Sequence, residues 1–150
     1  QTALLFVLQR PDATHIEAIA AIERELFTNP YTATDVSGWA ALEHMMVKAV
    51  LSAPDVAGYV IASAVGNESE LYRIAVARPF RRSGVGSLLM TSYLDWCTAQ
   101  QLAVSFLEVD ETNLSAVGLY SRHGYVAFSR RSHYYGAHDA LCMKKVLSRD

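Results

Sequence analysis

The sequence predicts an α/β fold in which a mixed β-sheet is flanked by helices. A strand, a glycine-containing turn and a helix follow one another over Leu71–Trp96. Two strand-like runs precede this stretch, and a buried-type apolar strand follows it. Consecutive strands joined by short turns form an antiparallel meander, whereas a strand that follows a strand–helix unit returns parallel by a right-handed crossover. The sheet should therefore contain both parallel and antiparallel neighbours.

A short strand and a helix are predicted at the N-terminal end. The strand is Ala3–Leu8, and Arg10–Asp12 ends it. Asp12 or Thr14 should cap the helix, because Thr14 and Glu17 have the spacing of a capping box. Apolar residues then recur along one helix face: Ile16, Ile19, Ile22, Leu26 and Phe27.

A second helix and three strands complete the first half of the chain. The second, less regular helix is predicted over Thr34–Leu42. Strands follow at Met45–Leu51, Val56–Val65 and Glu70–Ala77, and Gly66–Ser69 is the turn before the third. Apolar and β-branched residues bounded by turn residues predict such strands.

The second half alternates helix and strand. The apolar face of the helix after the turn comprises Val85, Leu88, Leu89, Tyr93, Trp96 and Cys97. Leu102–Val109 is then a buried-type strand. Asn113 begins a helix that Gly124 ends, and Leu114, Val117 and Tyr120 or Ser121 lie on one face of it. Tyr125–Phe128, then Arg130–Tyr135, and finally Ala140–Val146 are predicted to form a closing pair of strands, with the turn between them at Gly136–Asp139. The whole predicts about seven strands and four helices in a single domain over residues 1–150.

Composition narrows the class of function. The formal net charge is −2 with 19% charged residues, which argues against broad nucleic-acid or anionic-membrane binding. No uninterrupted apolar run reaches the length of a membrane span, and no signal peptide is visible. Cys97 and Cys142 lie in apolar patterns without metal-ligand spacing, so we expect buried free thiols and a cytoplasmic protein.

The turn after the third strand is suited to bind a phosphate. It reads Arg81-Arg82-Ser83-Gly84-Val85-Gly86 and opens a helix, whose first N–H groups lie at its positive end. Arginine adds charge-assisted donors, and glycine lets a ligand approach the backbone. A Walker A loop needs Gly-Lys-Ser/Thr, which is absent, and Leu89 stands where a dinucleotide fingerprint needs its third glycine. An Arg-x-x-Gly-x-Gly turn remains.

This turn is similar to the acetyl-CoA pyrophosphate loop of the GNAT acetyltransferases. The second half of the chain also resembles that family, and within it the RimI-type N-terminal acetyltransferases of bacteria. The residues that carry this resemblance are Leu107-Glu108-Val109, Asn113, Leu119-Tyr120, Gly124-Tyr125, Arg130-Arg131, Tyr134-Tyr135 and Asp139-Ala140-Leu141. It implies a GNAT fold, acetyl-CoA as co-substrate and acetylation of a protein N-terminus, as RimI-type enzymes act on the N-terminal alanine of ribosomal protein S18.

The resemblance also implies roles for individual residues. Glu108 would be the general base and Tyr120 the general acid, with Glu70 on the neighbouring strand as a competing base. Backbone N–H groups of Ile74–Val76 would face the thioester. Residues expected to contact the coenzyme are Ile74, Ala75, Val76, Arg81, Arg82, Ser83, Gly84, Val85, Gly86, Ser87, Asn113 and Tyr120. Residues expected to contact the acceptor are Tyr31, Glu70, Tyr134 and Tyr135.

Acetyl transfer to an amine requires a neutral nitrogen, and this favours an N-terminal acceptor. An α-amino group has a pKa of about 8 and a lysine side chain about 10.4, so roughly a tenth of the α-amine is neutral at pH 7. A carboxylate base therefore needs to give less help in deprotonating an N-terminal amine than in deprotonating a lysine side chain. Acetylation of a small amine or a lysine side chain stays open, as does a non-catalytic acyl-CoA-binding module.

The remaining expectations concern metals and assembly. His123, His133 and His138 are scattered without an i, i+4 pair, so no metal site is expected. Direct transfer in a ternary complex is the simplest mechanism, and a monomer or weak dimer is the expected state.

Overall fold

The structure, a computed structural model, describes residues 5–147. The described chain forms a seven-stranded mixed sheet in the order β1-β2-β3-β4-β5-β7-β6, with four α-helices. This confirms the predicted fold class. The described residues group into two compact units, residues 5–62 with Arg73–Tyr93, and Ser63–Tyr72 with residues 94–147. The single domain over residues 1–150 stays a prediction.

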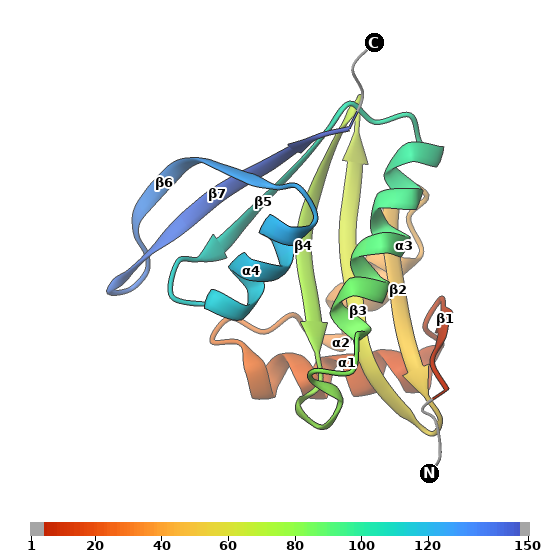
Figure 1. The fold of residues 1–150 in the computed structure, drawn as a ribbon. Coiled ribbons are helices and arrows are strands. Elements are labelled where there is room, and N and C mark those ends of the chain that lie inside the picture. The colour runs from red at the N-terminus through yellow and green to blue at the C-terminus, as the bar shows by residue number, and fades with distance from the viewer. Residues whose placement is uncertain (1–4, 148–150) are drawn as a thin grey trace. The chain divides into compact units, whose positions relative to one another are not determined.

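The first unit is built from the N-terminal elements and the start of the third helix (Figure 1). Its complete elements are β1 (Val7–Gln9), α1 (Ala13–Leu26), α2 (Ala33–Ala40) and β2 (Met45–Ser52). It also contains most of β3 (Asp55–Val65), the end of β4 (Glu68–Val76) and the start of α3 (Val85–Ala99). β1 pairs antiparallel with β2. The core of this unit comprises Ile16, Ile19, Val36, Val47, Ala49, Val56, Tyr59, Ile61 and Ala75.

Two N-terminal details differ from the prediction. Helix α1 is capped by Asp12, whose carboxylate accepts from the His15 N–H at 2.9 Å while the His15 ring accepts from the Asp12 N–H at 3.2 Å. Asp12, one of the two predicted caps, is thus confirmed, whereas the capping box of Thr14 and Glu17 is wrong, because the helix starts earlier and both residues lie inside it. The predicted first strand differs as well: residues 5 and 6 are not in a strand, β1 runs from Val7 to Gln9, and the predicted residues 3 and 4 lie outside the described part.

The second unit contains the first residues of β4 and the C-terminal strands (Figure 1). It contains β5 (Val104–Asp110), α4 (Leu114–Arg122), β6 (Val126–Tyr135) and β7 (His138–Val146). The first residues of β4 lie parallel to β5, from Glu68 opposite Val104 to Leu71 opposite Leu107. This confirms the predicted parallel return of β5. β7 is antiparallel to both β5 and β6.

Two boundaries and one helix face in this unit correct the prediction. β4 begins at Glu68 because Gly66 and Asn67 suffice for the turn, and the small Ser69 is buried. β7 begins at His138 rather than Ala140, whereas β6 pairs with β7 as the predicted closing pair requires, with an irregular register. Leu114 was grouped on one helix face with Tyr120 or Ser121, but Leu114 is 77% exposed at the first helical position of α4, whereas Tyr120 is buried.

The end of α4 follows the predicted glycine signal. Gly124 has φ +91°, the left-handed conformation that a residue after a helix C-cap commonly adopts. The chain then places Tyr125 in the core, where its hydroxyl lies 2.6 Å from the Ser105 hydroxyl. Cys97 and Cys142 are buried free thiols, as predicted. In the described residues, no helix is long and apolar enough to cross a membrane.

Candidate functional site

The turn between β4 and α3 has the geometry of an anion-binding loop. The first bond along α3 runs from the Leu88 N–H to the Gly84 carbonyl at 3.0 Å. N–H groups earlier in the first turn therefore have no partner inside the helix, at its positive end. Gly84 has φ +87°, and no atom lies within 4 Å of where its Cβ would be. The turn thus has room for a phosphate close to its main chain.

The two arginines of this turn differ in their local contacts. Arg81 donates from Nε to the Val76 carbonyl at 3.4 Å, so its side chain folds back over the end of β4. Arg82 is exposed and has φ +62°, an uncommon backbone conformation for a residue with a Cβ. The Ser83 hydroxyl donates to the Phe80 carbonyl. Since that bond uses the hydroxyl proton, Ser83 would serve a ligand mainly through its main chain.

Close packing at Gly58 fixes where α3 begins. A Cβ at this position of β3 would lie 2.7 Å from the Ala75 carbonyl oxygen, 2.8 Å from Val85 Cγ1 and 3.1 Å from Leu89 Cδ1. Only a residue without a side chain lets α3 approach β3 so closely. In β4, Ala75 is buried whereas Ile74 and Val76 are partly exposed, as strand alternation requires.

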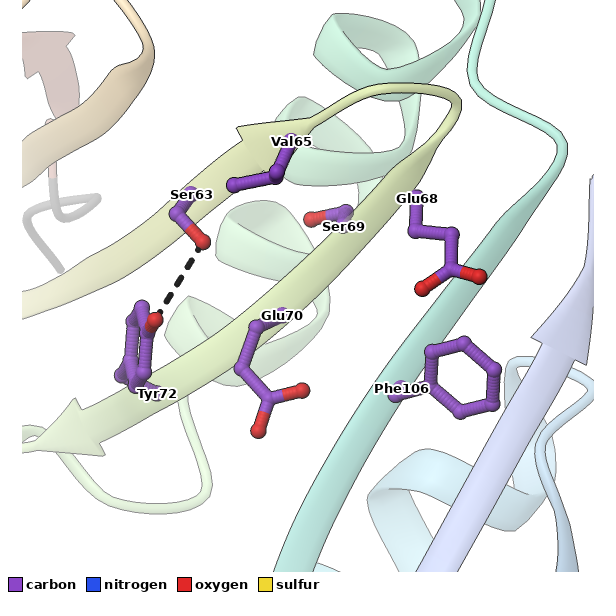
Figure 2. A pocket seen from close by; sticks show the side chains of 7 residues that line it. All are labelled: Ser63, Val65, Glu68, Ser69, Glu70, Tyr72 and Phe106. Atoms are coloured by element: carbon purple, nitrogen blue, oxygen red, sulfur yellow. Dashed lines mark hydrogen bonds between the residues drawn. The ribbon is translucent and has the colours of Figure 1, made fainter.

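In the second unit, two carboxylates of β4 line a hollow of about 230 Å³. Figure 2 shows Glu68 and Glu70 pointing from β4 toward the side on which the Phe106 ring lies. Burial raises the pKa of Glu70 above its ordinary 4.5, and the negative charge of Glu108 raises it further. A raised carboxyl pKa strengthens the group as a proton acceptor.

Glu108 lies at the centre of a polar group on β5, β6 and β7. Its Oε1 is 2.8 Å from Nε of Arg131 and 3.9 Å from Sγ of Cys142. The Arg131 guanidinium lies 5.6 Å from the centre of the Tyr134 ring. Burial and the charge of Glu108 raise the pKa of the Cys142 thiol, which therefore stays protonated near neutrality. The structure thus brings together two predicted residues, Glu108 and Tyr134, through Arg131, to which no role had been assigned.

Helix α4 contributes two further predicted residues of this unit, Tyr120 and Asn113. Tyr120 is buried at 7% exposure, and its ring centre lies 5.9 Å from that of Tyr125. The Asn113 side chain accepts from the Ala116 N–H at 3.2 Å, so Asn113 is the N-cap of α4. Its amide oxygen is used by the helix, which leaves the NH₂ group to serve a ligand. Tyr135 ends β6, and its side chain lies outside the described part of the structure.

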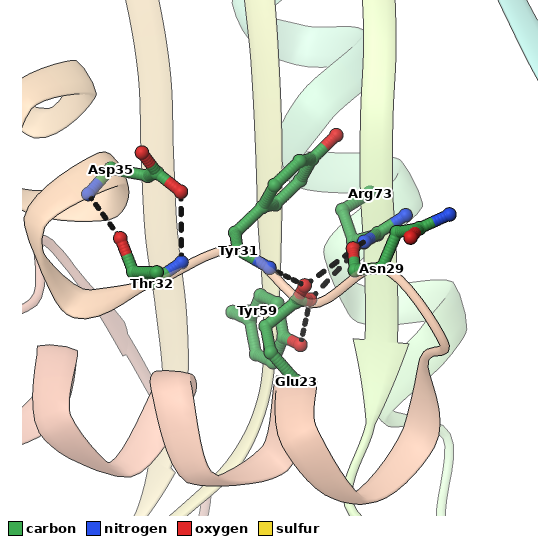
Figure 3. Close-up of polar contacts among 7 residues, drawn as sticks. All are labelled: Glu23, Asn29, Tyr31, Thr32, Asp35, Tyr59 and Arg73. Atoms are coloured by element: carbon green, nitrogen blue, oxygen red, sulfur yellow. Dashed lines mark hydrogen bonds and ion pairs between the residues drawn. The ribbon is translucent and has the colours of Figure 1, made fainter.

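A buried ion pair that the sequence reasoning missed lies in the first unit. Figure 3 shows Glu23 of α1 bonded to Arg73, Tyr59 and the main chain of Tyr31. Glu23 is 0% exposed. A signal existed in the sequence, because Glu23 falls on the apolar face that Ile16 and Ile19 define. Tyr31, expected at the acceptor groove, is half-buried beside this pair.

The histidines do not converge on one another. Among residues 5–147, no group of three or more His, Cys, Asp or Glu is arranged to hold a metal ion. His138 Nδ1 lies 3.3 Å from Asp110, and His123 Nδ1 lies 2.9 Å from the Leu119 carbonyl of its own helix. These contacts give both rings a local structural role.

Comparison with known proteins identifies the family. The sequence model of the Acetyltransferase (GNAT) family matches residues 14–125, which is more than half of the chain. The chain belongs to the GNAT acetyltransferase family. It is therefore an acetyl-CoA-dependent N-acetyltransferase.

Individual relatives of this GNAT enzyme agree with the family match. The [ribosomal protein bS18]-alanine N-acetyltransferase of Salmonella typhimurium is 29% identical over 140 residues, 90% of this chain and 93% of that protein. The crystal structure of the ribosomal-protein-S18-alanine N-acetyltransferase from Escherichia coli superposes with a TM-score of 0.87 at 23% identity, over 97% of this chain and 96% of that one. Ard1 from Thermoplasma volcanium also superposes with a TM-score of 0.87, at 25% identity over 96% and 99%.

Proposed function

We propose that this GNAT enzyme acetylates the N-terminal amine of a protein, and that its substrate is the N-terminal alanine of ribosomal protein S18. The observation that carries the proposal is the likeness to the S18-alanine acetyltransferase of Salmonella typhimurium over 90% of the chain. Sequence similarity over nearly the full length of both chains supports a shared reaction better than similarity confined to the β4–α3 turn would. The identity of 29% leaves the acceptor to be tested.

Residues of the first unit are assigned to acetyl-CoA. The pyrophosphate is assigned to the main-chain N–H groups of Gly84–Ser87 and to the side chains of Arg81 and Arg82, which are exposed. The N–H groups of Ile74–Val76 are assigned to the thioester carbonyl and the pantetheine amides. Hydrogen bonds to the carbonyl oxygen stabilise the negative charge that develops there during attack. The Asn113 amide, from the second unit, is assigned to the pantetheine.

The proposed reaction is direct transfer. The neutral amine attacks the thioester carbon, a C–N bond forms, the C–S bond breaks, and the amine's proton passes to a base. Glu108 is proposed as that base, acting through a water because an ordinary carboxylate is a weak base. Glu70 competes for the role, since its pKa is raised and Glu108 already bonds to Arg131.

Tyr120 is proposed to stabilise the departing thiolate of the coenzyme. A tyrosine pKa of about 10 lies above a thiol pKa of about 8.5, so full proton transfer to the thiolate is uphill. Tyr120 should therefore act chiefly by donating a hydrogen bond to sulfur. Tyr31, Tyr134 and Tyr135 are proposed to contact the acceptor peptide.

The experiment that tests the proposal measures thiol release from acetyl-CoA with a panel of acceptors. The panel contains the N-terminal hexapeptide of ribosomal protein S18, hexapeptides that begin with other residues, an N-blocked lysine peptide and a polyamine. We expect turnover with free peptide N-termini and the highest kcat/KM with the S18 peptide. Turnover only with the blocked lysine peptide or the polyamine would contradict an N-terminal acceptor and leave the family assignment intact.

Variants then separate the proposed roles. Glu108→Gln and Glu70→Gln each remove one candidate base, and Glu43→Gln, an exposed carboxylate outside both groups, is the control. The true base variant should lose about 10²–10⁴-fold in kcat and the rising limb of its pH profile. Tyr120→Phe should lower kcat with little change in the KM for acetyl-CoA. Coenzyme binding without turnover on any acceptor would instead indicate a binding module.

A further inference from the structure

Glu23 is a fully buried carboxylate that no proposed catalytic step uses. It lies on the inner face of α1 at 0% exposure. A buried carboxylate destabilises the fold unless it is paired and hydrogen-bonded. Its partners therefore show what the group is for. Both carboxylate oxygens have partners, and these come from β3, β4 and the segment after α1 (Figure 3).

The bonds of Glu23 converge on the segment that joins α1 to α2. Oε1 accepts from the Tyr31 main-chain N–H at 2.9 Å, and Oε2 accepts from the Tyr59 hydroxyl at 2.5 Å. Nη2 of Arg73 donates to Oε1 at 3.0 Å, and Nε lies 3.2 Å from Oε2. One carboxylate thus joins a core tyrosine, a strand arginine and a loop amide.

Arg73 holds the same segment a second time. Its Nη2 also donates to the Asn29 carbonyl at 3.0 Å. Its guanidinium carbon lies 3.9 Å from the centre of the Phe27 ring and 4.1 Å from that of the Tyr31 ring. Contacts of a guanidinium with aromatic rings at this range are attractive and geometrically selective. The segment Phe27–Tyr31 is therefore attached by its main chain at Asn29 and Tyr31 and by its two rings.

We propose that Glu23 and Arg73 are positioning residues that hold Phe27–Tyr31 as a preformed wall of the acceptor site, and that this wall sets the preference for the acceptor's first residue. The inference rests on the proposed function, which assigns Tyr31 to the acceptor. Because the charges of Glu23 and Arg73 offset each other, the wall presents mainly aromatic and main-chain groups. Such a wall suits a small or apolar first residue and disfavours a charged one.

The test compares acceptor kinetics in matched variants. Glu23→Gln keeps the side-chain shape and removes the charge, and Glu17→Gln, exposed on the same helix, is its control. The panel is a set of hexapeptides that differ only in their first residue, Ala, Ser, Met or Asp. Glu23→Gln should raise KM for the Ala peptide about tenfold and narrow the preference for Ala over Asp. The KM for acetyl-CoA should stay within about twofold, because this segment is not assigned to the coenzyme.

A second variant guards against a folding defect in the first. Arg73→Lys keeps the positive charge but loses the bidentate bond and the contact with both rings. If the arrangement of the segment matters, Arg73→Lys should shift the same selectivity ratio. If only a buried charge pair matters, Arg73→Lys should behave as wild type, and the proposal would be overturned.

Amide hydrogen exchange tests the holding role without any turnover. The Tyr31 N–H should exchange faster in Glu23→Gln and Arg73→Lys than in wild type and Glu17→Gln. Unchanged exchange, or a rise in acetyl-CoA KM equal to that for the peptide, would overturn the inference. If wild type acetylates no peptide, the proposed function fails together with the selectivity clause. The exchange rates then decide the holding role alone.

Discussion

Replacing Gly58 with alanine should destabilise the protein, whereas the same replacement at Gly38 should stabilise it. A Cβ at Gly58 would meet the Ala75 carbonyl oxygen at 2.7 Å and Val85 Cγ1 at 2.8 Å. Neither neighbour can yield easily, because one is main chain and the other is a buried side chain at the first position of α3. Gly38 lies in α2 with no atom within 4 Å of its Cβ position.

The two magnitudes follow from the type of contact. Forcing a methyl group into a packed core costs about 1–3 kcal/mol. An alanine in place of glycine inside a helix gains up to about 1 kcal/mol from intrinsic helix preference. For a chain of this length, each kcal/mol shifts Tm by about 2–4 °C. Gly58→Ala should therefore lower Tm by about 2–12 °C, and Gly38→Ala should raise it by up to about 4 °C.

Urea unfolding and thermal melts of wild type, Gly58→Ala and Gly38→Ala measure these stability changes. The KM for acetyl-CoA is measured for the same three proteins. A shift of α3 away from Gly58 would also move the N–H groups that the helix offers to a phosphate, so Gly58→Ala should raise that KM. Gly38→Ala should leave it unchanged. Equal effects of both alanines on the free energy of unfolding would refute the packing argument, because the chemical change is the same.

Three further predictions follow from the described contacts. Glu70→Gln should stabilise the protein at pH 7 but not at pH 4. The pKa of Glu70 is raised in the folded state, so its contribution to the free energy of unfolding is present below about pH 4.5 and is lost as pH rises through the raised value. Thermal melts of wild type and variant at both pH values check this. Alanine at Arg81 or Arg82 should raise the KM for acetyl-CoA by about tenfold, more at low salt than at high salt, whereas Arg24→Ala, exposed on α1, should not; kinetics at two ionic strengths would expose a purely structural effect. Asp12→Ala should cost about 1 kcal/mol of stability by removing the cap of α1, and an unchanged urea midpoint would contradict the cap.

The sequence predicts those parts of the fold that depend on local pattern. Periodicity locates α1 and α3, and the parallel return of β5 follows from chain connectivity. The start of β4 was missed because Glu68 and Ser69 are common turn residues, while Ser69 is buried by its neighbours in the sheet. Tertiary surroundings, rather than residue type, decide such positions.

The same distinction between local patterns and long-range contacts holds for the candidate site. The β4–α3 turn is visible in the sequence because glycines, arginines and a helix start stand next to one another. The ion pair of Glu23 with Arg73 joins residues fifty positions apart, and that of Glu108 with Arg131 depends on the register of three strands. Only the folded chain reveals such partners, although a carboxylate on an apolar helix face indicates that one must exist.

The way in which Glu23 and Arg73 hold their segment has a consequence for how acceptor preference can change. Two of the contacts end on main-chain atoms, the Tyr31 N–H and the Asn29 carbonyl, which survive almost any exchange of side chain. Only proline at position 31 would remove the donor. A directed-evolution library at Thr28, Asn29 and Pro30 should therefore yield many folded variants with altered acceptors. New acceptor specificities should arise at these three positions without any change to Glu23 or Arg73.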